Sequence, residues 1–173
     1  MAYLIFHYKE NANYACFYPA AEHPRDYLSS GVVTVYDDGK IIAYDRNCLN
    51  EIVNEKIICE DISVTNKIDK LLEDNKWKIR FIPKFLGAWG FEGTCENIWL
   101  KNRHFRGTNF LFGYKKKNKE EFHQWKKQLK KDKVYEWRKY VRYGRSINRF
   151  RDIYDEVRKI LIDAGMPENL MTE

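Results

Sequence analysis

The sequence predicts an α+β protein: an antiparallel sheet of about six short strands with one packed helix, followed by a helical, basic C-terminal third. Short β-branched and aromatic runs alternate with turn residues in the first two thirds of the chain. One segment there has apolar residues at helical spacing, and this spacing becomes general after Tyr114. We therefore divide the chain into a mixed sheet domain, residues 1–114, acidic at its start, and a basic helical extension packed on the same domain, residues 115–173.

Two hairpins are expected near the N-terminus. Residues 3–9 and 14–18 are apolar and aromatic, and the turn-forming residues between them favour antiparallel pairing. Residues 20–30 include Pro24 and two serines, and they predict a loop. Residues 31–45 give the clearest signal, since two β-branched runs flank an Asp-Asp-Gly turn in which glycine can take a positive φ.

The middle of the chain mixes short helices and strands. Residues 47–54 predict a short helix, and residues 57–59 predict a brief strand. Ser63 is a suitable N-cap for a helix that ends near Asn75, because the apolar residues between them share one face. Residues 77–82 have apolar side chains at alternate positions and predict a strand.

The segment that follows predicts one loop and two strands. Residues 85–93 hold three glycines among large apolar side chains, which indicates a loop that packs against the core. Strands are expected at residues 96–100 and 109–114. The intervening residues 101–108 would then form a basic turn.

The last third predicts three helical stretches. Residues 122–129 and 134–141 each have apolar residues spaced by three and four, with a phase shift near Asp132. Gly144 is a suitable C-cap, and it predicts a break in the helix. A final helix is expected over residues 147–164, where the apolar spacing continues until a glycine and a proline stop it.

Charge is divided unevenly along the chain. Residues 1–75 carry 7 basic and 13 acidic residues, whereas residues 76–173 carry 24 basic and 12 acidic residues. Between Lys101 and Arg151 the excess is densest, with 18 basic residues against 4 acidic ones. Because like charges repel, such a region suggests a partner of opposite charge, and a phosphate backbone is the obvious polyanion.

The basic region also has a pattern. The arginines at positions 138, 142, 145 and 149 are spaced by 4, 3 and 4, which would place them on one face of an unbroken helix. Guanidinium groups bind phosphate oxygens in a bidentate manner, and nearby aromatic side chains can stack on unpaired bases. A break at Gly144 would split the four arginines into two pairs. The residues expected to contact nucleic acid are Arg103, Arg106, Lys126, Lys127, Lys130, Lys131, Trp137, Arg138, Tyr140, Arg142, Tyr143, Arg145 and Arg149.

These patterns lead to a main hypothesis, a non-enzymatic module that contacts the phosphate backbone of RNA or DNA through a basic, aromatic-interleaved helical surface. A first alternative is a small inhibitor or immunity-type protein from a phage or mobile element, acting on a nucleic-acid enzyme. Aromatic and arginine side chains are also enriched at protein interfaces, which favours this alternative. A solvated lysine-rich surface, or pairing of the arginines with the acidic first half, would account for the charges without a ligand.

A second alternative is a phosphodiester-cleaving enzyme. His104 lies between Arg103 and Arg106, and these cations favour a neutral imidazole that can act as a general base. Asp37 or Asp38 would then hold a metal ion, although both are explained more simply as turn residues. No two histidines have metal-ligand spacing, so the sequence predicts neither a metal site nor a cofactor.

The remaining features concern the compartment. Four cysteines lie at wide, irregular spacings, which favours reduced thiols over a disulfide framework. The N-terminal residues lack the basic segment of a signal peptide. No apolar stretch approaches the roughly 18 residues that span a bilayer. We therefore expect a cytoplasmic protein with no membrane contact.

Overall fold

The computed structural model describes residues 4–11, 28–86, 95–108 and 117–171, and these form an α+β fold, as predicted. Within these residues, six strands make one antiparallel sheet. The strands are β1 (Leu4–Asn11), β2 (Leu28–Tyr36), β3 (Lys40–Asn47), β4 (Ile52–Glu60), β5 (Cys95–Leu100) and β6 (Arg103–Thr108). The helices are α2 (Ile62–Asp74), α3 (Lys76–Arg80), α4 (Lys119–Lys131) and α5 (Trp137–Asp163).

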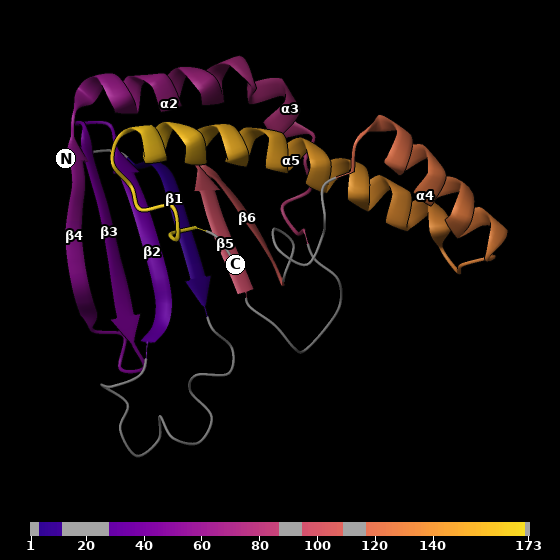
Figure 1. The fold of residues 1–173 in the computed structure, drawn as a ribbon, viewed down its shortest axis with the longest axis horizontal. Coiled ribbons are helices and arrows are strands. Elements are labelled where there is room, and N and C mark those ends of the chain that lie inside the picture. Colours follow the sequence, from indigo (N-terminus) through magenta and orange to yellow (C-terminus); the bar gives the residue numbers. More distant parts are fainter. Residues whose placement is uncertain (1–3, 12–27, 87–94, 109–116, 172–173) are drawn as a thin grey trace.

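The strand order across the sheet is β4-β3-β2-β1-β5-β6. β1 to β4 form an antiparallel series that grows toward one edge. The chain then returns through α2 and α3 and adds β5 and β6 on the other side of β1 (Figure 1). β1 is therefore central, paired with β2 and with β5.

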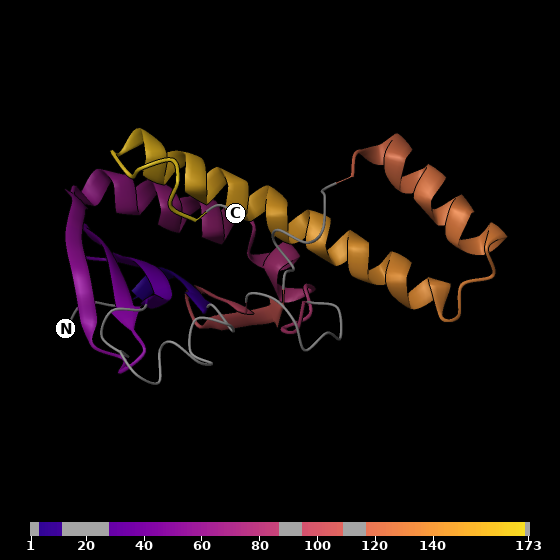
Figure 2. The ribbon, with the colours of Figure 1, turned by 60° about the horizontal axis from the view of Figure 1, so that its bottom comes forward.

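Two helices cover one face of the sheet. α2 and the C-terminal part of α5 lie across this face and contact each other (Figures 1 and 2). The N-terminal part of α5 extends beyond β5 and β6, and α4 folds back along it (Figure 2). The molecule thus has a two-layer body and a projecting pair of helices, which we call the helical hairpin (residues 117–149).

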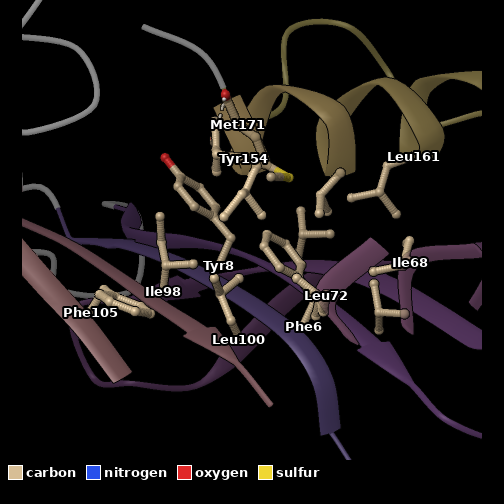
Figure 3. Close-up of a cluster of buried hydrophobic side chains, with 14 of the residues drawn as sticks. Phe6, Tyr8, Ile68, Leu72, Ile98, Leu100, Phe105, Tyr154, Leu161 and Met171 are labelled. Atoms are coloured by element: carbon tan, nitrogen blue, oxygen red, sulfur yellow. Dashed lines mark hydrogen bonds between the residues drawn. The ribbon is translucent and has the colours of Figure 1, made fainter. Parts of the chain in front are cut away.

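The core lies between the sheet and the two covering helices (Figure 3). Phe150 of α5 is fully buried, and its ring centroid lies 5.0 Å from that of Phe105 and 6.4 Å from that of Tyr154. The Tyr154 hydroxyl donates a hydrogen bond of 2.9 Å to the carbonyl of Met171, which fixes the C-terminal segment to the core. Other buried members are Phe6, Tyr8, Ile68, Leu72, Ile98, Leu100, Val157 and Leu161.

The clearest predicted hairpin is confirmed as β2 and β3. Its turn contains Gly39 with φ +97°, and a Cβ at this position would lie 2.8 Å from the backbone nitrogen of Ile62. The Gly39 carbonyl accepts a hydrogen bond from the Asp61 N–H at 3.1 Å. The predicted central helix is confirmed as α2, but its N-cap is Asp61, whose side chain accepts from the Ser63 N–H at 2.7 Å.

The two edges of the sheet differ. β4 is mostly exposed, and it pairs with β3 with two register shifts. Beside β6, the Leu86 N–H donates to the Arg106 carbonyl at 2.8 Å, and the Arg106 N–H donates to the Lys84 carbonyl at 2.9 Å. Within the described residues, the β6 edge is therefore partly covered and the β4 edge is open.

The helix predicted at residues 47–54 is wrong, whereas the strand predicted at residues 57–59 lies within β4. The Asn47 side-chain oxygen accepts from the N–H groups of Leu49 at 3.1 Å and Glu51 at 2.9 Å. Short polar side chains compete for backbone donors in this way and favour a turn over a helix. The chain therefore turns after β3 and enters β4 directly.

The strand predicted at residues 77–82 is also wrong, since most of this segment forms the short helix α3. Ile79 and Ile82 are both buried, and their separation by three residues fits a helical turn. Residues 103–108 form a strand and not the predicted basic turn. The charged outer positions of this strand concealed the alternation that places Phe105 in the core.

The break predicted at Gly144 is wrong, and so is the start of the last helix at residue 147. α5 is one helix of 27 residues that continues through Gly144. Its apolar face changes direction there because the helix changes partner, from α4 to the sheet and α2. The phase shift near Asp132 is confirmed, since Asp132 is the C-cap of α4.

Several predictions fall on residues that the structure does not describe. The strands expected at residues 14–18 and 109–114 lie outside the described residues. Of the loop expected at residues 20–30, the last three residues belong to β2 instead. Of the packed loop at residues 85–93, only Phe85 and Leu86 are described, and Leu86 is fully buried.

Candidate nucleic-acid interface

The start of the helical hairpin is fixed by two asparagines. The Asn118 side chain accepts from the Glu121 N–H at 2.9 Å, and the Glu121 carboxylate accepts from the Asn118 N–H at 2.9 Å, forming a capping box. Asn148 of α5 donates to the Lys117 carbonyl at 2.8 Å and accepts from the Lys117 N–H at 3.2 Å. These bonds join the beginning of α4 to the middle of α5.

The two helices of the hairpin meet at their partly buried aromatic residues, and no residue of α4 is fully buried. Lys130 Nζ lies 4.8 Å from the ring centroid of Trp137. The Arg145 guanidinium lies 5.9 Å from that of Phe122. The hairpin, residues 117–149, carries 12 basic and 4 acidic residues, so most of its exposed charge is positive.

The four predicted arginines form one row on α5, which we call the arginine stripe: Arg138, Arg142, Arg145 and Arg149. All four side chains are exposed, and the helix that carries them is continuous. At about 100° per residue, they fall within about 60° of one another around the helix axis. At about 1.5 Å per residue, the row is about 16 Å long.

Among the described residues, no carboxylate forms an ion pair with the arginine stripe. Other cations are paired. Lys101 Nζ lies 2.7 Å from Asp69 Oδ1 and 2.6 Å from Glu73 Oε1, which ties the turn between β5 and β6 to α2. In the hairpin, Lys139 pairs with Glu136 at 3.0 Å. In the described part of the chain, the acidic first half therefore does not neutralise the stripe.

The other predicted basic contacts are not gathered on the stripe. Arg103 is directed inward, where it donates to the Ile82 carbonyl at 2.8 Å and its guanidinium lies 5.5 Å from the Phe105 ring centroid. Arg106 is exposed on β6. On α4, Lys126 is half-buried, and the exposed lysines are Lys127, Lys130 and Lys131.

The three predicted aromatic contacts occupy different environments. Trp137 already has two cations against its ring, with Lys130 Nζ at 4.8 Å and the Arg138 guanidinium at 5.5 Å from its centroid. Tyr143 packs against the core. Tyr140 is 53% exposed. It lies about 190° around α5 from the mean direction of the stripe, however, and cannot stack on a base held there.

A histidine and tryptophan cluster lies on the sheet face opposite the helices. His7, Trp99 and His104 are neighbours across three strands. The Trp99 and His104 rings stack with centroids 4.1 Å apart, and His7 meets Trp99 edge-on at 4.8 Å. His7 Nδ1 lies 2.8 Å from the Thr34 hydroxyl, and His104 Nε2 lies 3.1 Å from the Asn97 side-chain oxygen.

Both histidines in this cluster favour the neutral form. Burial, together with the charges of Lys9, Arg46 and His104, lowers the pKa of His7 to about 4. Burial, followed by the charges of Arg106 and Lys84, lowers the pKa of His104. A neutral imidazole is compatible with a general base, but the His104 ring contacts an amide oxygen and an indole ring.

The aspartates of the enzyme hypothesis lie elsewhere. The Asp38 side chain accepts from the Lys40 N–H at 3.1 Å, as expected for a turn residue. This turn joins β2 to β3, whereas His104 lies on β6, three strands away from β2. At about 4.8 Å per strand, the two sites are at least about 14 Å apart. The structure therefore does not bring His104 together with Asp37 or Asp38.

Sequence reasoning missed a groove between α5 and the segment formed by α2 and α3. Its volume is 610 Å³. Trp77 and Phe81 of the α3 segment are 61% and 71% exposed, and both line it. A helical interpretation of this segment would have placed these two residues side by side, four positions apart. We call it the aromatic groove, and its lining is Leu71, Asn75, Trp77, Lys78, Phe81, Arg149, Asp152, Ile153 and Glu156.

Three further findings concern metals, thiols and membranes. Among the described residues, no group of three or more histidine, cysteine or acidic side chains is placed to hold a metal ion. Of the cysteines in the described ranges, Cys48 and Cys59 form no disulfide. No helix in the described ranges is long and apolar enough to cross a bilayer.

Comparison with known proteins gives no relative: no family model matches the chain, and no curated protein or solved structure matches it. The function must therefore be argued from the residues of this chain.

Proposed function

We propose that this chain binds nucleic acid through the arginine stripe, as a non-enzymatic module that contacts the phosphate backbone of RNA or DNA. The observation that carries the proposal is a row of four exposed guanidinium groups without ion-pair partners among the described carboxylates. Like charges at this spacing destabilise a helix by about 0.2–0.5 kcal/mol per pair. A ligand that neutralises the charges accounts for their placement.

The length of the stripe suits a phosphate backbone. Measured along the axis of a duplex, where one strand has one phosphate per about 3.4 Å, its roughly 16 Å span about five phosphates of that strand. Guanidinium groups are the side chains best suited to bidentate phosphate contact. If four phosphates are neutralised, the affinity for a duplex falls about 100-fold between 50 and 200 mM salt.

The test is a binding titration with fluorescently labelled oligonucleotides. Fluorescence anisotropy measures the affinity at each of a series of salt concentrations. In the stripe variant, all four arginines are replaced by glutamate. The matched control replaces Lys56, Lys67, Lys70 and Lys159, which are exposed outside the hairpin, by glutamate. Both variants change the net charge equally. We expect the stripe variant to lose at least about 100-fold in affinity and the control to lose less than about 10-fold.

Two outcomes contradict the proposal. Equal losses in the two variants would show that net charge alone governs binding. Failure of the parent chain to bind any oligonucleotide at low salt would remove the proposal altogether. The inhibitor hypothesis would then remain, with the same arginines contacting carboxylates of an acidic protein surface.

A further inference from the structure

We propose that the aromatic groove holds an unpaired base of a strand whose phosphates lie on the arginine stripe. This inference rests on the proposed function and narrows its ligand to single-stranded or locally unpaired nucleic acid. The starting point is that Arg149 belongs to both features: it is the last residue of the stripe, and it also lines the groove.

The stripe leads into the groove along one face of α5. Asp152, Ile153 and Glu156 line the groove on the α5 side. Their positions fall within about 50° of the mean direction of the stripe, so the helix face that carries the arginines continues into the groove. A strand that follows the stripe toward the C-terminal end of α5 therefore arrives at the groove.

The opposite wall of the groove has the residues of a stacking platform. Trp77 and Phe81 are 61% and 71% exposed, and both line the same groove. The Arg80 guanidinium lies 5.4 Å from the Trp77 ring centroid and adds positive charge beside it. Lys78 also lines this side. Aromatic rings with adjacent cations are the combination that single-strand binding proteins use.

The carboxylates of the groove decide which part of a nucleotide enters it. Asp152 and Glu156 are exposed acidic residues of the lining. They disfavour a phosphate inside the groove by charge repulsion, whereas a carboxylate can accept hydrogen bonds from the amino group of a base. The arrangement therefore favours the base in the groove and the phosphate outside it, on Arg149.

Other exposed aromatic residues do not meet these conditions. Tyr140 lies on the side of α5 away from the stripe. Trp137 is half-buried and has two cations over its ring, whereas Trp77 is 61% exposed and has one. Trp77 and Phe81 are exposed aromatic residues that line the groove which Arg149 of the stripe also lines.

The test compares a single strand with a fully paired duplex of the same length. The groove variant is Trp77→Ala combined with Phe81→Ala; both side chains are exposed, so the fold is retained, as circular dichroism would verify. The matched control is Tyr140→Ala, which removes an exposed aromatic ring on the other side of α5. We expect the groove variant to lose about 10-fold or more in affinity for the single strand and to keep its affinity for the duplex.

A second measurement reports on stacking directly. A single strand carrying 2-aminopurine should lose fluorescence when it binds the parent chain, and this quenching should disappear in the groove variant. Full single-strand affinity in the groove variant, or an equal loss in the Tyr140 control, would overturn the inference and leave the proposed function standing. If the parent chain binds neither ligand, both the inference and the proposed function are wrong.

Discussion

The two parts of α5 belong to one helix but have opposite surroundings. Residues 137–145 carry four basic and no acidic residues, whereas residues 146–163 carry four of each. In the first part only Val141 and Gly144 are buried, whereas the second part buries seven residues, including Phe150 and Leu161, in contact with the sheet and α2. We infer from this difference that residues 146–163, the packed part of α5, hold the whole helix in place. The first part can then expose Arg138, Arg142 and Arg145, which have no ion-pair partner among the described carboxylates, without having to fold alone.

This division of roles has a physical basis. An isolated helix is marginal in water, and repulsion between like charges weakens it further. Burial of apolar surface stabilises at about 25 cal/mol per Å², which easily outweighs such repulsion when the two act on one continuous helix. The packed part of α5 therefore stabilises the charged part through helix continuity.

The largest expected effect comes from Phe150→Ala in the packed part. Phe150 is fully buried between other aromatic residues, so the substitution should lower the free energy of unfolding by about 3–5 kcal/mol. Urea denaturation measures this change. The same measurement on Tyr140→Ala, in the exposed part, should show a change within about 0.5 kcal/mol. Similar losses in the two variants would contradict the division of roles.

A proline at Gly144 would separate the two parts. Proline inside a helix removes a backbone hydrogen bond and clashes with the preceding turn, at a cost of about 3 kcal/mol. We expect Gly144→Pro to keep the sheet while loosening residues 137–143, which amide hydrogen exchange would show. Salt-dependent oligonucleotide binding should weaken together with this loosening. Parent-like protection of residues 137–143 would show that the hairpin does not depend on α5 being continuous.

Acid should destabilise the sheet through His7. The pKa of His7 in the folded protein, about 4, lies below its usual 6.5, so the unfolded chain takes up the proton first as pH falls. His7 thus contributes stability that is present above about pH 6.5 and is lost as pH falls toward about 4. The ring is partly exposed, and solvent screens its charge. We therefore expect His7 to contribute about 2 kcal/mol to the free energy of unfolding, less than the full pKa difference would give.

The measurement is chemical denaturation at a series of pH values for the parent chain and for His7→Gln. The difference between their unfolding free energies should change over this pH range and be constant above about pH 7. A constant difference across the whole range would show that His7 does not titrate as the burial of its ring implies.

The smallest effect is expected at the start of α4. Asn118→Ala removes the capping box and should destabilise the first turn of α4 by about 1 kcal/mol. Amide hydrogen exchange should increase at residues 119–122 and not in the sheet. Asn118→Ser keeps a capping oxygen and serves as the control. An increase of the same size in the serine variant would show that capping is not what orders this turn.

The fold could be predicted where one physical signal dominated. Alternating β-branched residues predicted β2 and β3, and regular spacing predicted α4 and the end of α5. The predicted break at Gly144 was wrong because the apolar face of α5 changes direction there without the helix ending. A change of packing partner produces the same sequence pattern as the end of one helix and the start of another. The strand predicted at residues 77–82 was wrong because the apolar positions in a segment of six residues fit both the two-residue period of a strand and the 3.6-residue period of a helix.

The candidate site was predictable only in part. The spacing predicted the arginine stripe only for an unbroken helix, whereas the sequence also predicted a break at Gly144. In the structure α5 is continuous, and the four residues lie on one face. Arg103 and Trp137 were predicted as contacts from the same basic and aromatic composition. In the structure Arg103 donates to the Ile82 carbonyl and Trp137 packs against Lys130. The aromatic groove could not be predicted, because it requires α3 and α5 to meet, and that contact depends on how the helices cross the sheet.

The edge strand β4, which no described residue covers, has a consequence for concentrated protein. Flat, regular edges present a straight row of free backbone groups and seed fibrils when copies add to one another. In β4, Asn54 has φ +53°, the ladder slips twice, and Glu55 and Lys56 are exposed. The backbone N–H and C=O groups of β4 are therefore not aligned to pair with a strand of a second copy, and the charged side chains of Glu55 and Lys56 oppose its approach. Strand addition of a second copy at β4 is therefore less favourable than at a regular edge strand.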